Sequence, residues 1–159
     1  LAISIRFRNV RWTRAITAAM IASTLAGMLA NASRLTTGRV RPRYEHKLGA
    51  GFQGLFHEDK LTLGDSRRNS FPSGHTATAF GFAVPFALFF PGFGWVALGG
   101  AAAIAYSRMI LGAHHFSDVA ASIVLSIAIG WLVSSWVRNR GDAAWHAIRT
   151  RWNARFPGK

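Results

Sequence analysis

Four long stretches without a charged residue constrain the fold of this chain more than any other feature. A helix needs about 20 apolar residues to cross a bilayer core about 30 Å thick. The stretches cover residues 15–33, 76–90, 93–106 and 119–137. A chain of 159 residues cannot readily surround four all-round apolar helices with polar ones. We therefore expect an all-α, integral membrane helical bundle with four transmembrane helices, rather than a large soluble core.

The order of the stretches predicts which loops share a side of the membrane. Segments 34–70 and 112–117 fall on one side, and a turn at Pro91-Gly92 falls on the other. Basic residues precede the first stretch and follow the last, which predicts that the Pro91 side is cytoplasmic, although segment 34–70 is also basic. The tryptophans expected to mark the cytoplasmic interface are Trp12, Trp95, Trp131 and Trp136. We expect a protein of the cell (inner) membrane whose 34–70 side is extracytoplasmic.

The net charge of +13 accompanies 50% hydrophobic residues, which is unusual. Because the hydrophobic residues form runs and the arginines lie between them, we expect anionic membrane lipids as partners and no nucleic acid. We expect a single domain over 1–159, with a core at 14–137 and a basic cytoplasmic tail at 138–159. Spacing predicts either a frayed tail or a surface helix with one apolar face, formed by Trp145, Ile148, Trp152 and Phe156.

The first motif that carries chemistry follows the first apolar stretch and reads Arg34-x6-Arg41-Pro42. A guanidinium stays charged and can bind two phosphate oxygens at once. An arginine cluster at the end of a membrane helix is, however, also typical of contacts with solvent or lipid headgroups. This motif indicates a phosphate site only together with others.

The second motif, Pro72-Ser73-Gly74-His75, lies where the second apolar stretch begins. Ser73 suits an N-cap, and Gly74 leaves backbone N–H groups open to a ligand. The dipole of the helix also attracts an anion to this place, next to His75. The alternative is an ordinary capped helix with a histidine at the membrane interface.

The third motif, Ser107-Arg108-x5-His114-x3-Asp118, joins the third and fourth stretches. The spacing places His114 and Asp118 on one helical face, where the carboxylate can fix the imidazole tautomer and leave the other nitrogen as a nucleophile. An aspartate near a membrane helix is costly, so it is a functional candidate. A helix cap or a local ion pair is the alternative. Spacing does not exclude His115 as the nucleophile.

The other histidines belong to no such group, and no cluster has the spacing of a metal site. We expect His46, His57 and His146 to be exposed, and we expect neither a metal nor a cofactor. Segment 44–69 is expected to shape the access of a lipid headgroup.

Taken together and in this order, the three motifs resemble those of the type 2 phosphatidic acid phosphatase superfamily, which shares its active site with vanadium haloperoxidases. The family pattern is Lys-x6-Arg-Pro, then Pro-Ser-Gly-His, then Ser-Arg-x5-His-x3-Asp. The chain matches the second and third motifs fully, and the first with Arg34 in place of lysine. The resemblance covers residues 15–137. It implies the membrane lipid phosphate phosphatase branch, whose members have six helices, with the last four present here.

The resemblance also implies roles within a metal-independent mechanism. His114 would be the nucleophile, in preference to His115, and would form a phosphohistidine. Asp118 would orient it, and His75 would protonate the leaving oxygen and then activate water. The residues implied to bind phosphate are Arg34, Arg41, Ser73, Gly74 and Arg108.

The expected function is therefore hydrolysis of a lipid phosphate or lipid diphosphate. One alternative is a vanadium-dependent haloperoxidase-like enzyme, against which the apolar stretches argue because those relatives are soluble. Another is a non-enzymatic membrane protein that binds lipid headgroups. It would need the arginines but not His75, His114 and Asp118.

Overall fold

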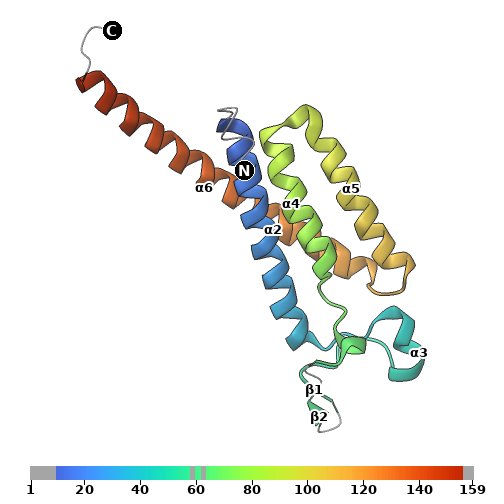
Figure 1. The fold of residues 1–159 in the computed structure, drawn as a ribbon. Helices are drawn as coiled ribbons and strands as arrows, with labels where there is room; N and C mark the ends of the chain where they lie inside the picture. Colours follow the sequence, from blue (N-terminus) through green and yellow to red (C-terminus); the bar gives the residue numbers. More distant parts are fainter. Residues whose placement is uncertain (1–9, 58–59, 62–63, 156–159) are drawn as a thin grey trace.

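The computed structural model describes residues 10–57, 60–61 and 64–155, without the side chains of residues 60, 144–149 and 151–155. Four long helices cover the four apolar stretches (Figure 1). They are α2 (Val10–Thr37), α4 (Gly74–Phe89), α5 (Pro91–Ile110) and α6 (Phe116–Arg155). The all-α helical architecture is thus confirmed. By length and composition, α2, α5 and residues 116–143 of α6 can each cross a membrane, whereas α4 has 16 residues and is shorter.

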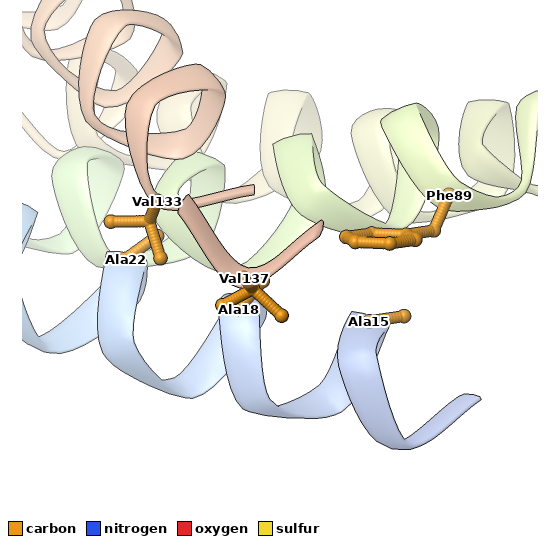
Figure 2. Packing of buried hydrophobic residues seen from close by; sticks show 6 residues of the cluster. All are labelled: Ala15, Ala18, Ala22, Phe89, Val133 and Val137. Atoms are coloured by element: carbon orange, nitrogen blue, oxygen red, sulfur yellow. The ribbon is translucent and has the colours of Figure 1, made fainter. Parts of the chain in front are cut away.

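Helix α4 is the centre of the bundle. It packs against α2, α5 and α6, and α2 also packs against α6. A cluster of mostly small buried side chains fills the space between α2, α4 and α6 (Figure 2), formed by Ala15, Ala18, Ala22, Phe89, Val133 and Val137. Lipid tails are as apolar as these side chains, so close backbone packing rather than exclusion of water holds such helices together.

One close approach of the α4 backbone to the α2 backbone requires a glycine. A Cβ on Gly81 would lie 2.9 Å from both the carbonyl oxygen of Ala22 and the Cα of Ser23. Both atoms belong to the α2 backbone, which cannot move aside as a flexible side chain can. Gly81 therefore sets the distance between the two helices.

Helices α4 and α5 form the expected hairpin, but the turn is earlier than we expected. Helix α4 ends at Phe89, Phe90 alone links the helices, and Pro91 and Gly92 already belong to α5. Proline is favoured in the first helical position because its fixed φ suits a helix and its missing N–H is not needed there. The Pro91-Gly92 pair therefore starts a helix here.

Helix α6 is longer than the fourth apolar stretch and has 40 residues. Residues 138–155 continue this helix without a break, so most of the predicted tail is not a separate element. Asp142 binds Arg14 at 2.9 Å and so ties α6 to the start of α2. The tail face predicted from Trp145, Ile148, Trp152 and Phe156 lies outside the described residues and side chains.

The segment between α2 and α4 folds at one end of the bundle. It contains η1 (Pro42–Tyr44), α3 (Glu45–Leu48), η2 (Ser66–Arg68), and the antiparallel strands β1 (Phe56–His57) and β2 (Lys60–Leu61). Helix α2 ends here, α4 begins, α5 ends and α6 begins (Figure 1). All three sequence motifs therefore lie at the same end of the bundle, as the order of the helices predicts.

Asp65 holds the last part of this segment. Its carboxylate accepts hydrogen bonds from the backbone N–H of Arg67 and from the guanidiniums of Arg67 and Arg68. The side-chain hydrogen bond from Arg67 lowers the pKa of Asp65 to about 2. This anchor is present at neutral pH and is lost only when the pH falls from about 4 toward 2.

Replacing Gly81 by alanine tests the close approach of α4 to α2. The added methyl group would press on the α2 backbone, so we expect the free energy of unfolding to fall by about 1–3 kcal/mol. Gly99→Ala is the matched control, because a Cβ at Gly99 on α5 would meet nothing within 4 Å. Unfolding is followed by circular dichroism during titration with a denaturing detergent. Equal stability of the two variants would contradict the packing described.

Candidate active site

The structure brings all eight predicted site residues to the end of the bundle that holds the motifs. Each lies at or beside a helix end, so the backbone fixes its position. They are Arg34 in the last turn of α2, Arg41 before η1, Ser73 before α4, Gly74 and His75 in the first turn of α4, Arg108 in the last turn of α5, His114 between α5 and α6, and Asp118 in the first turn of α6.

Ser73 links two helices. It occupies the N-cap position of α4, but its side chain makes no capping hydrogen bond. Its hydroxyl oxygen accepts from the Thr76 hydroxyl at 2.9 Å, and its backbone N–H donates to the carbonyl of Asp118 at 3.3 Å. The start of α4 is thereby tied to the start of α6.

Gly74 allows Arg34 to reach the start of α4. A Cβ on Gly74 would lie 2.9 Å from Asn31 Oδ1 and 3.5 Å from Arg34 Nη1. Any larger residue would push against this pair. The glycine thus brings a guanidinium of α2 beside the first turn of α4, where the helix dipole already favours an anion.

His75 lies within reach of the other charged groups of the site. It is exposed, and it interacts electrostatically with Arg108, His114, Arg34 and Arg41. These groups come from α2, α4, α5, the segment between α2 and α4, and the segment between α5 and α6. Two imidazoles and three guanidiniums that are distant in sequence therefore share one site.

The guanidiniums at this site are only partly paired. Among the described residues, the buried side-chain atoms without a hydrogen-bond partner are the Nε atoms of Arg34, Arg39 and Arg41, and Ser134 Oγ. Burial, and then the charges of Arg43 and Arg34, lower the pKa of Arg41 from its ordinary value. Crowded cations with open donors are the kind of arrangement that suits an anion such as phosphate.

His114 is held by a backbone carbonyl. It is 3% exposed, and its Nδ1 lies 2.6 Å from the carbonyl oxygen of Ser70. A carbonyl can only accept, so Nδ1 carries a proton, and in the neutral imidazole the lone pair is on Nε2. No hydrogen bond from the described part of the chain reaches Nε2. The ring therefore has the tautomer that a nucleophile requires.

Asp118 is within ion-pair distance of His114 but is too far away for a hydrogen bond to it. The distance from His114 Nδ1 to Asp118 Oδ2 is 3.8 Å, which is longer than a hydrogen bond. The buried carboxylate instead accepts from the Arg39 guanidinium, the Ser70 hydroxyl and the backbone N–H of His115. Asp118 thus reaches His114 through Ser70, whose hydroxyl binds the aspartate and whose carbonyl binds the imidazole.

His115 has both ring nitrogens next to carboxylates. Its Nε2 lies 2.8 Å from Glu45 Oε1, and its Nδ1 lies 3.3 Å from Asp118 Oδ2. Neither nitrogen is free to attack a substrate. The structure therefore favours His114 over His115, an alternative that spacing left open.

Three contributors to this arrangement could not be identified from the motifs. Ser70 acts partly through its backbone carbonyl, which any residue type supplies. Arg39 belongs to none of the three motifs, and its partner Asp118 is 79 positions away. Glu45 meets His115 across 70 positions. Sequence spacing carries no signal for contacts of this range.

The remaining histidines lie outside this constellation. His46 is exposed and His57 is partly buried, so the prediction of exposure holds for the first but not fully for the second. The side chain of His146 lies outside the described part of the chain. Within residues 10–57, 60–61 and 64–155, no three His, Cys, Asp or Glu side chains are grouped so that they could hold a metal ion.

Comparison with known proteins gives one family and two curated relatives. The model of the PAP2 superfamily matches residues 14–142. A lipid A 1-phosphatase of Rhizobium etli is 34% identical over 106 residues, which are 67% of this chain and 42% of the relative. A lipid A 1-phosphatase of Rhizobium johnstonii is 36% identical over 98 residues, which are 62% of this chain and 38% of the relative. No solved structure gave a significant match.

The chain therefore spans about two fifths of the length of these relatives. The family match, by contrast, covers most of the chain and includes all three motifs, whose residues the fold gathers at one site. This chain belongs to the PAP2 superfamily.

Proposed function

We propose that this protein is a membrane-embedded phosphatase that hydrolyses a lipid phosphate or lipid diphosphate through a phosphohistidine intermediate, without a metal ion. One observation carries the proposal. His114 is buried, its Nδ1 is bound by a carbonyl, and it lies beside His75 among guanidiniums with open donors. The two relatives named lipid A 1-phosphatase support a lipid phosphate as the substrate and make lipid A-type phosphates the first to test.

In the first step, His114 Nε2 attacks the phosphorus atom. A bond forms between Nε2 and phosphorus while the bond from phosphorus to the lipid oxygen breaks. His75, starting as the imidazolium, donates its proton to that oxygen, and the lipid leaves as an alcohol. For a diphosphate the group that leaves is the lipid monophosphate. His114 then carries the phosphoryl group.

In the second step, the roles of His75 are reversed. Neutral His75 takes a proton from a water molecule, whose oxygen attacks the phosphorus. The bond between Nε2 and phosphorus breaks, and inorganic phosphate is released. His114 and protonated His75 are then ready for another cycle. Because His75 lies beside both His114 and Arg108, it can serve the two half-reactions without moving far.

The arginines stabilise the transferred group rather than react with it. Phosphoryl transfer depends mainly on positioning and on charge stabilisation, which donors fixed before the reaction supply best. The positive charges of Arg34, Arg41 and Arg108 all act on His75. Ser73 and Gly74 complete the site by holding the first turn of α4 against α6 and α2.

We further propose that the site faces the extracytoplasmic side of the inner membrane. The support is the distribution of basic residues around the end of the bundle opposite the site, where Arg11, Arg14, Arg138 and Arg140 gather at the start of α2 and along α6. The arginines at the other end have different uses. Arg39 binds Asp118, Arg67 and Arg68 bind Asp65, and Arg34 and Arg41 have open donors for the proposed phosphate.

Replacing His114 by alanine is expected to lower the rate of phosphate release at least about 10⁴-fold, because the nucleophile is removed. The assay follows inorganic phosphate released from lipid A 1-phosphate and phosphatidic acid in detergent micelles. His115→Gln, at the neighbouring position, is the matched control and should retain measurable turnover. Radiolabelled phosphate should be trapped on the wild-type protein and not on His114→Ala. Lipid binding without turnover by the wild-type protein would instead support a headgroup-binding protein.

Replacing Ser70 by alanine removes the hydroxyl that binds Asp118 and keeps the carbonyl that binds His114. We expect kcat to fall by about 10- to 100-fold, because the imidazole loses its alignment. In a double-mutant cycle, Asp118→Asn together with Ser70→Ala should be no slower than Asp118→Asn alone. Losses that multiply would show that Asp118 does not act through Ser70.

Ser126→Ala is the matched control for this cycle. Ser126 is also fully buried, and its hydroxyl joins α6 to α4 by donating to the carbonyl of Ala77 at 2.9 Å. It lies two helical turns beyond Asp118. We expect the kcat of the Ser126→Ala variant to match that of the wild-type protein, because the substitution changes only the packing between α4 and α6.

The chain has no cysteine, so single cysteines can report the orientation. Ser66 and Asn139 are both exposed, the first at the site end and the second on α6 near the other end. In spheroplasts, a membrane-impermeant maleimide should label Ser66→Cys. It should label Asn139→Cys only after the membrane is permeabilised. The reverse pattern would place the site in the cytoplasm.

A further inference from the structure

A groove of about 500 Å³ opens beside His75, between α4, α5 and one residue of α2. On α4 its wall runs from His75 to Ala83, and on α5 it runs from Ala97 to Ile104. On both helices the lining residues recur at intervals of three or four, so each wall is a single helical face. The groove is therefore a continuous channel along two neighbouring helices.

The groove begins at the active site and runs toward the middle of the bundle. Helices α4 and α5 are antiparallel and joined at Phe90 (Figure 1), so Ile104 lies at the His75 end and Ala97 at the Ala83 end. From His75 to Ala83 the axis of α4 rises by about 12 Å. One end of the groove is thus at the chemistry, and the other lies among the apolar parts of the helices.

The walls of the groove are effectively apolar beyond His75. Two hydroxyls lie along it, but both are occupied by backbone carbonyls. Ser23 donates to the carbonyl of Thr78 at 3.0 Å, and Thr78 donates to the carbonyl of Gly74 at 3.1 Å. The other lining side chains are hydrocarbon, and Gly100 has none. Such a surface suits a hydrocarbon chain.

We propose that this groove holds an acyl chain of the substrate during phosphoryl transfer, an inference that rests on the proposed phosphatase function. His75 protonates the oxygen that joins the phosphate to the lipid, so the lipid part of the substrate lies on the His75 side of the phosphorus. The apolar groove begins at that side chain. A chain that leaves the lipid oxygen can therefore enter it directly.

The groove contributes orientation rather than binding energy. The chain moves from the hydrocarbon of the membrane into a hydrocarbon-lined site, so little is gained from excluding water. Contact along two helical turns instead restricts where the lipid oxygen can sit relative to His75. Misplacement of a reacting atom by about 1 Å can cost about 10²-fold in rate. The groove should therefore raise the rate for long-chain substrates and have little effect on the rate for short-chain ones.

Filling the groove tests this inference. A Cβ at Gly100 would meet nothing within 4 Å, so Gly100→Leu places a side chain in the groove without a clash. Gly99→Leu is the matched control, because Gly99 is also open but does not line the groove. Phosphate release is measured from phosphatidic acid with two 16-carbon chains and with two 4-carbon chains, both in the same detergent.

We expect Gly100→Leu to lower the ratio of kcat/KM for the 16-carbon over the 4-carbon substrate at least about tenfold, and Gly99→Leu to leave that ratio unchanged. Phe82→Ala removes part of the opposite wall and should lower the same ratio. This second variant keeps the test decisive if Gly100→Leu does not fold. An unchanged ratio in both groove variants, or equal loss of both substrates, would overturn the inference. A wild-type protein that releases phosphate from neither substrate, nor from lipid A 1-phosphate, would instead overturn the proposed function.

Discussion

A carboxylate buried at the start of a membrane helix is costly unless its charge is compensated nearby. Asp118 is fully buried, and it is compensated by the Arg39 guanidinium, the Ser70 hydroxyl and the N–H of His115. Arg39 and Ser70 belong to the segment between α2 and α4. The need to balance one charge therefore holds that segment against α6, and with it the carbonyl that orients His114.

The same balance leaves the site with an excess of positive charge. Arg39 is paired with Asp118, whereas Arg34 and Arg41 form no ion pair with any carboxylate in the described part of the chain, and the Nε atoms of all three are unpartnered there. The acidic side chains of Asp118 and Glu45 are both already paired, with Arg39 and His115. An anion from outside is what the arrangement lacks. The positive charge of the site is therefore the feature that supports the phosphate ligand proposed above.

The position of the site at the end of the bundle follows from the solvation of its groups. Guanidiniums and imidazoles are tolerated where the helices end, while the interior between the helices is filled by alanines and a few larger apolar side chains. A lipid phosphate likewise has a charged part followed by an apolar part. Its phosphate matches the helix ends, and its chains match the groove between α4 and α5 that begins at His75.

The sequence by itself determined the order of the four long helices and the end of the bundle that carries the three motifs, and the spacings within those motifs predicted where the eight candidate site residues lie. These follow from apolar length and short spacings, which are local properties. Only the tertiary structure decided that α6 continues through the tail, that Ser70 stands between Asp118 and His114, and that His115 is occupied by Glu45. These outcomes depend on contacts between residues 44 or more positions apart, made by backbone atoms or by side chains whose partners no local pattern reveals.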